Sequence, residues 1–227
     1  MKSRLFKDFD ERAQEVSKFF LLLKNLEQGS IKLAMGNSHN QKIKDIDSDL
    51  EKTLKATGYL LLYNLIESTM RNALEAIFDE INDKEVSFDN LRNEIKKIVI
   101  ENFKHNRSSE KLLVNITTIS LDIISASFDK QKLFSGNIDS RKIKKTASNY
   151  GFSYETNAAK TGNGYDLLTV KTNRNDLAHG FKSFKEVGKE AGAEELLQIQ
   201  KRVISYLKGI LENIGTYIDK QEYLQKP

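Results

Sequence analysis

The sequence predicts an all-α fold, an antiparallel helical bundle with long helices and a helical insertion. The one proline, Pro227, ends the chain, so the usual helix breaker is missing from everything before it. Apolar residues recur at spacings of three and four over long stretches, which is the helical period. With 227 residues, the chain is also long enough to bury a sizeable core.

Three apolar-periodic stretches predict the main helices of the bundle. The first runs over residues 5–28 and ends at Gly29, and the second runs over residues 46–81 as the spine of the fold. The last apolar series runs over residues 196–217. Residues 29–44 are rich in turn formers and predict a surface connection.

Residues 83–164 are predicted to form a helical subdomain inserted in a single domain that spans residues 1–227. Its helices are expected to end near residues 103, 128 and 150, and each begins with a capping side chain: Ser87, Ser108 or Ser109, and Asp139 or Ser140. Residues 153–164 and 181–192 are expected to be irregular.

Residues 130–145 form a basic arm in this insertion. They hold six basic residues against one acid, a net charge of +5, whereas the whole chain carries +4. We expect the arm to contact RNA phosphates, and the alternative is a solvated helix face. The basic residues are Lys130, Lys132, Arg141, Lys142, Lys144 and Lys145.

Composition excludes several classes of function. Cysteine is absent, and the three histidines lie far apart, so we expect no metal and no other cofactor. No apolar run approaches the roughly 18 residues that span a membrane, and the charged start does not predict a signal peptide. The expected location is therefore the cytoplasm. Residues 162–164, Gly-Asn-Gly, lack the pattern of a phosphate-binding loop.

An arginine, a histidine and small polar residues meet at the end of a predicted helix that starts near Tyr165 and stops at Gly180. Arg174 falls on the apolar stripe of this helix, so it should face a carboxylate, a phosphate or a second subunit. His179 lies five positions further along, which places the two side chains roughly 140° apart on a straight helix. They converge only if the helix ends near Gly180 or if two copies face each other. The alternative is a surface arginine followed by a histidine that only caps the helix.

The order Arg174, Asn175, three residues and then His179 resembles the signature of the HEPN superfamily, small all-α proteins that are often RNA-cleaving toxins or defence effectors. Residues 62–69, 184–188 and 217–224 also resemble one stand-alone bacterial branch of it. The resemblance implies a homodimer with two copies of the motif across a two-fold axis, Arg174 and His179 as catalytic residues, and Asn175 as an orienting residue.

The chemistry fits a substrate that carries its own nucleophile, which in RNA is the 2′-hydroxyl group. Histidine exchanges protons near neutral pH, and arginine is suited to the charge on the phosphate. A single-stranded RNA would then be cleaved to a 2′,3′-cyclic phosphate without a metal.

Asn64 and Glu67 are candidate supporting residues. With Arg71 they step by three and four along one face of the predicted spine. Glu67 and Arg71 could form an ordinary surface pair. Given the resemblance, Asn64 and Glu67 are candidates for orienting Arg174 or His179.

Two other functional classes remain open. One is a catalytically silent helical module that binds RNA or a partner protein, such as an antitoxin or a defence component. The other is a binder of small nucleotide ligands.

Overall fold

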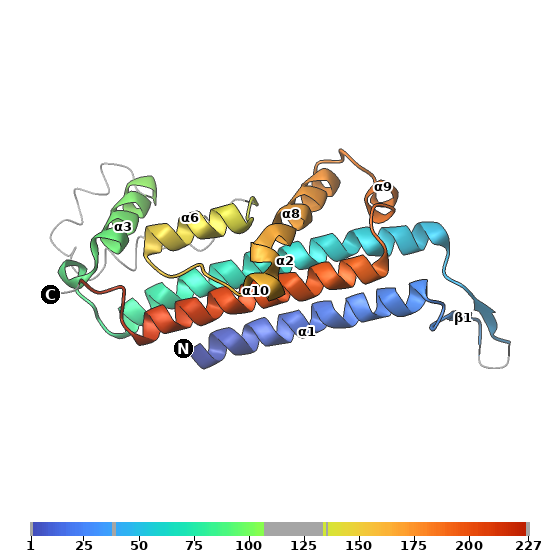
Figure 1. Cartoon of the computed structure of the whole chain (residues 1–227), viewed down its shortest axis with the longest axis horizontal. Coiled ribbons are helices and arrows are strands. Elements are labelled where there is room, and N and C mark those ends of the chain that lie inside the picture. The colour runs from blue at the N-terminus through green and yellow to red at the C-terminus, as the bar shows by residue number, and fades with distance from the viewer. Residues whose placement is uncertain (1, 38–39, 107–133, 135, 226–227) are drawn as a thin grey trace. The chain divides into compact units, whose positions relative to one another are not determined.

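The computed structural model describes residues 2–37, 40–106, 134 and 136–225. The predicted all-α bundle is confirmed: long helices dominate, and the only strands among the described residues form one small hairpin (Figure 1). The three predicted main helices are α1 (Lys2–Glu27), α2 (Ser48–Asp83) and α10 (Ala193–Asp219).

The chain divides into two compact units, and α1, α2 and α10 contribute to both. The first unit contains residues 1–7, 67–156 and 207–227, and the second contains residues 8–66 and 157–206. The predicted organisation, one domain with residues 83–164 inserted, stays a prediction.

Helices α1 and α2 pack closely in the second unit. Phe20 of α1 is completely buried, and a Cβ atom built on Gly58 of α2 would lie 2.9 Å from its Cζ atom. Glycine in mid-helix costs about 1 kcal/mol relative to alanine, and here it lets the phenylalanine ring approach the backbone of α2. The one glycine within the predicted spine therefore marks a close contact and leaves the helix unbroken.

The connection over residues 29–44 differs from its prediction because it contains an antiparallel hairpin. Strand β1 (Leu33–Met35) pairs with β2 (Lys42–Lys44), with Leu33 opposite Lys44 and Met35 opposite Lys42. Apolar residues alternate along β1 and its approach, but this period of two is too short to predict a strand. The hairpin extends beyond the ends of α1 and α2 that it joins (Figure 1), and all six strand residues are exposed, so the segment is still a surface element.

Two segments predicted to be irregular contain short helices. Residues 153–164 include α7 (Ala158–Thr161) and the 3-10 turn η3 (Gly162–Gly164), and residues 181–192 include α9 (Phe184–Gly188). Helix α9 begins with a capping box, in which Ser183 and Glu186 satisfy each other's backbone N–H groups. Such helices are set by capping hydrogen bonds and are too short to show an apolar period.

In the first unit, α3 (Asn93–Asn106) packs against α6 (Ser140–Tyr150). The prediction for α6 is confirmed: Asp139 accepts a hydrogen bond from the backbone N–H of Lys142, and Gly151 ends the helix at a φ of 86°. Arg92 joins this region to the chain end, because its Nη1 atom donates to the carbonyl of Glu222 at 3.2 Å and to that of Gly151 at 3.5 Å.

The prediction that Ser87 begins a helix through residue 103 is wrong in detail. Ser87 caps the 3-10 turn η1 (Phe88–Asn90), and α3 starts three residues later. Leu91 lies between the two helices and forms a backbone bridge with Leu224, which interrupts the helix. The helix predicted to end near residue 128 lies outside the described residues.

No helix within the described ranges is long and apolar enough to cross a membrane.

We expect Gly188→Ala to destabilise the fold by about 1–3 kcal/mol or more, the usual cost of overpacking a core. A Cβ atom at this position would lie 1.8 Å from the carbonyl oxygen of Lys52, which belongs to the backbone of α2 and cannot rotate away. The free energy of unfolding in urea measures the effect. Gly192→Ala is the matched control, since its Cβ atom would meet the nearest atom at an ordinary 3.8 Å, and equal stability of the two variants would contradict the prediction.

Candidate functional site

Helix α8 (Tyr165–Ala178) carries the arginine and histidine motif, and its first turn is fixed to α10. The Asp166 side chain is buried and accepts two hydrogen bonds from Arg202, at 2.6 Å from Nε and 2.9 Å from Nη2. A carboxylate in the first turn also faces the positive end of the helix dipole. Leu167 and Val170 are completely buried on the same helix, so α8 has a defined orientation in the second unit.

Arg174 lies half-buried over the aromatic ring of Tyr63, with its guanidinium carbon 4.5 Å from the ring centroid. This is cation–π geometry, and Tyr63 on α2 is only 3% exposed, so the ring is a rigid support. The Nη1 atom of Arg174 also donates a 2.9 Å hydrogen bond to the Oδ1 atom of Asn175. That contact agrees with the orienting role predicted for Asn175, which stays a prediction.

His179 follows α8 as its C-cap residue, the position that the alternative interpretation gives it. The cap uses the backbone, because the His179 N–H donates to the carbonyl of Asn175 at 3.0 Å. The imidazole is solvent-exposed, and its centroid lies 5.7 Å from that of the Phe181 ring. One copy of the chain therefore presents the two motif side chains differently: Arg174 against α2, and His179 to solvent.

The turn after His179 has a defined geometry. Gly180 adopts a φ of 70°, in the left-handed region that glycine tolerates best. The backbone N–H of Phe181 donates to the carbonyl of Asp176 at 2.8 Å, and that of Gly180 donates to the carbonyl of Leu177 at 3.3 Å. These two bonds make a Schellman motif, which ends the helix at the place that the sequence predicts.

Asp176 and Lys182 flank this turn. Lys182 lies 3.4 Å from Asp176 and 2.8 Å from Glu190, measured between the charged atoms. The hydrogen bond to Glu190, with the help of Asp176, raises the pKa of Lys182 above its ordinary value. Lys182 therefore stays positively charged beside the motif at neutral pH.

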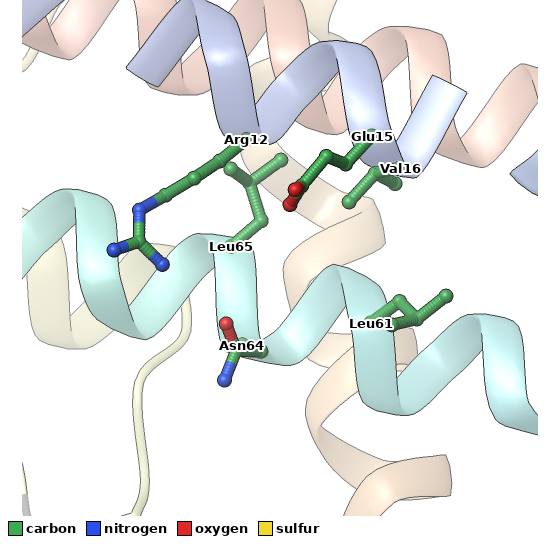
Figure 2. A pocket seen from close by; sticks show the side chains of 6 residues that line it. All are labelled: Arg12, Glu15, Val16, Leu61, Asn64 and Leu65. Atoms are coloured by element: carbon green, nitrogen blue, oxygen red, sulfur yellow. The ribbon is translucent and has the colours of Figure 1, made fainter. Parts of the chain in front are cut away.

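Asn64 is exposed on α2 and lines a hollow of about 110 Å³ between α1 and α2. Figure 2 shows this hollow, with three side chains from α1 across from three of α2. Its polar lining consists of Asn64, Arg12 and Glu15. The predicted role of Asn64 in orienting Arg174 or His179 stays a prediction.

Glu67 belongs to the first unit and forms the predicted i,i+4 ion pair with Arg71, although the pair is not the exposed one that the ordinary interpretation expects. Both side chains are half-buried, and the Nη2 atom of Arg71 also donates to the carbonyl oxygen of Phe134 at 3.2 Å. Glu67 thus helps to hold Arg71 against the chain before α6. Its predicted role toward Arg174 or His179 stays a prediction.

Helix α6 carries the described part of the basic arm, whereas Lys130 and Lys132 lie outside the described residues. Its apolar face is buried and its basic residues are exposed, so they share the opposite face of an amphipathic helix. Lys144 Nζ lies 5.4 Å from the ring centroid of Tyr154. The exposed basic residues are Arg141, Lys142, Lys144 and Lys145.

Two residues of the site are not predicted by the sequence. Tyr63 stands within residues 62–69, one of the segments that carry the resemblance, but periodicity does not show which ring of a facing helix an arginine meets. Phe181 falls in a predicted irregular connection, although an aromatic residue directly after a helix-ending glycine is a visible signal. Within the described residues, no group of three or more histidines and acids is arranged to hold a metal ion.

Comparison with known proteins identifies the family. No curated protein and no solved structure gives a significant match. A family model described as HEPN_MAE_28990-like HEPN matches residues 1–223, which is nearly the whole chain. HEPN domains are generally ribonucleases, so the match associates the chain with RNA-directed nuclease function. The chain belongs to the HEPN_MAE_28990-like HEPN family.

Proposed function

We propose that this protein is a metal-independent endoribonuclease of the toxin or defence type, which cleaves single-stranded RNA at a site shared by two copies of the chain. The observation that carries the proposal is the exposed imidazole of His179, held at the end of α8 by a defined turn, in a chain of a family of ribonucleases. The ring is exposed, so an RNA strand can reach it from solvent.

In the proposed reaction the 2′-oxygen of the RNA attacks the adjacent phosphorus, and the bond from phosphorus to the 5′-oxygen breaks. His179 accepts the proton of the 2′-hydroxyl group, and an imidazolium returns a proton to the leaving 5′-oxygen. The products are a 2′,3′-cyclic phosphate and a 5′-hydroxyl group. No water or other reactant is consumed in this step.

Arg174 is assigned to the phosphate. Its guanidinium lies over the Tyr63 ring, and a planar guanidinium can donate two parallel hydrogen bonds to phosphate oxygens. The hydrogen bond to Asn175 restricts the guanidinium further. An arginine prepared in this way stabilises the charge that builds on the phosphate oxygens without first having to be ordered.

A homodimer supplies the second histidine that the proposed reaction needs. Within one copy, Arg174 packs on α2 while His179 is exposed. Two motifs across a two-fold axis would let one His179 act as the base and its symmetry mate as the acid.

The second candidate is a silent module that binds RNA or a partner protein of a defence or toxin and antitoxin system. The exposed basic face of α6 favours RNA binding whether or not cleavage follows, because phosphate contacts need only positive charge at the surface. Cleavage of RNA in the presence of a chelator separates the two candidates.

His179→Ala is expected to lower the rate of RNA cleavage by at least about 100-fold, the low end of what general acid–base catalysis contributes. The ring is exposed and its cap uses only the backbone, so the melting temperature should stay close to that of the wild type. The assay follows a labelled single-stranded RNA in EDTA and identifies the 2′,3′-cyclic phosphate at the new end. Cleavage at the wild-type rate by the variant, or cleavage of an RNA whose 2′-hydroxyl groups are all methylated, would refute the mechanism.

Arg174→Lys is expected to keep the positive charge and still lose at least about tenfold in kcat, because an ammonium lacks the planar fork that holds a phosphate. Single-turnover rates on the same RNA measure the loss. Arg12→Lys, at an exposed arginine of α1, is the matched control and should cleave at the wild-type rate. If Arg174→Lys is as active as this control, Arg174 has no specific role in the reaction.

Replacing Lys144 and Lys145 with glutamine is expected to weaken RNA binding and flatten its salt dependence. The slope of log K against log salt should fall by about 0.7 for each phosphate that these lysines no longer neutralise. Fluorescence anisotropy with a 2′-O-methylated RNA measures binding without cleavage. The matched control replaces Lys201 and Lys208, two exposed lysines of α10, with the same change in net charge. Equal losses in the two double variants would show that only net charge matters.

A further inference from the structure

Phe181 is the most exposed of the large apolar side chains in the described residues, with 76% of its surface accessible to solvent. Its backbone is nevertheless fixed, since its N–H closes the Schellman motif onto the carbonyl of Asp176. The exposed ring is therefore attached to a backbone position that the turn defines.

The Phe181 ring does not make the packing contact that is usual at its position in the turn. In a Schellman motif, the residue at this position often packs back on the residue that accepts its hydrogen bond. That residue is Asp176 here, and its carboxylate is occupied by Lys182 at 3.4 Å. Phe181 is thus left facing solvent, beside the exposed imidazole of His179.

The two rings lie close and nearly side by side, with centroids 5.7 Å apart and planes inclined by 35°. Bases of single-stranded RNA bind to exposed aromatic rings by stacking, whereas the bases of a duplex are covered by their neighbours. A base and the phosphate joined to its ribose are separated by one sugar. A base placed on Phe181 would therefore bring its phosphate close to His179.

We propose that Phe181 stacks on the nucleobase next to the cleaved phosphate and so selects unpaired RNA, with purines preferred for their larger rings. The inference rests on the proposed ribonuclease activity and adds the residue that recognises the substrate at that site. Stacking needs no hydrogen bonds to the edges of the base. The substrate preference that Phe181 confers is therefore for large bases and for single-stranded RNA, and it does not extend to a particular base sequence.

The experiment uses the full chain and an RNA with one cleavable ribonucleotide in an otherwise 2′-O-methylated strand. An abasic residue replaces the base on either side of the cleaved bond in turn. For the wild type, we expect one of the two abasic substrates to raise KM by about 5- to 150-fold, the range found for the loss of one stacked base. Phe181→Ala should raise KM for the intact substrate to the same extent, with no further rise on that abasic substrate.

Tyr165→Ala is the matched control. Tyr165 is 71% exposed and stands at the opposite end of α8, so its loss removes a comparable exposed ring far along the helix from His179. This variant should keep the wild-type KM for every substrate. Phe181→Trp should keep a low KM, because its ring also stacks.

Three results would overturn the inference: a wild-type KM for Phe181→Ala, an abasic penalty that persists in that variant, or loss of the dimer in sedimentation velocity when Phe181 is replaced. The last would assign the ring to an interface between copies.

If the wild type cleaves no RNA, the proposed function fails, and binding of the fully 2′-O-methylated RNA decides the stacking proposal alone. A rise in Kd for Phe181→Ala would support it, and equal Kd values for the two proteins would overturn it.

Discussion

The paired hydrogen bonds between Asp166 and Arg202 set the orientation on which the candidate site depends. They hold the first turn of α8 on α10, and the buried Leu167 and Val170 then fix the rotation of the helix. The strength of the pair itself is modest, because the Arg202 side chain is 38% exposed and is screened by water. The pair has a larger effect on other orientations of α8. Any rotation of the helix would leave the buried Asp166 carboxylate without its partner, which is costly.

The support beneath Arg174 follows from the same orientation. Once α8 is fixed, Arg174 meets the buried ring of Tyr63, and the aromatic face attracts the cation without neutralising it. A carboxylate in the same place would form an ion pair and compete with an incoming phosphate. The ring instead orders the guanidinium without adding a negative charge beside it.

Much of the fold can be predicted from the sequence, because long helices repeat their apolar pattern many times. The bounds of α1 and α2 agree with their predictions within about three residues, and Asp139 is the cap of α6 as predicted. Elements with few residues cannot be predicted in the same way. Hairpin β1–β2 is held by pairing between segments, and α9 depends on the hydrogen bonds between Ser183 and Glu186.

The candidate site likewise has parts that local sequence predicts and parts that depend on contacts between segments. The helix that carries Arg174 and the stop at Gly180 follow from local pattern and turn chemistry. Which ring lies under Arg174 depends on how two helices dock, and neither helix contains that information in its own sequence. The direction of the Phe181 ring likewise depends on the geometry of the turn after the helix.

The hairpin at the end of α1 and α2 leaves backbone N–H and C=O groups along its outer edges, in a ribbon of only three residue pairs. Such edges can pair with extended segments of other chains. A hairpin with only apolar side chains would therefore promote aggregation. Lys42 and Lys44 stand opposite Met35 and Leu33, so each apolar side chain on that face has a cation beside it. Mutual repulsion between the lysines of two such ribbons therefore discourages them from joining edge to edge.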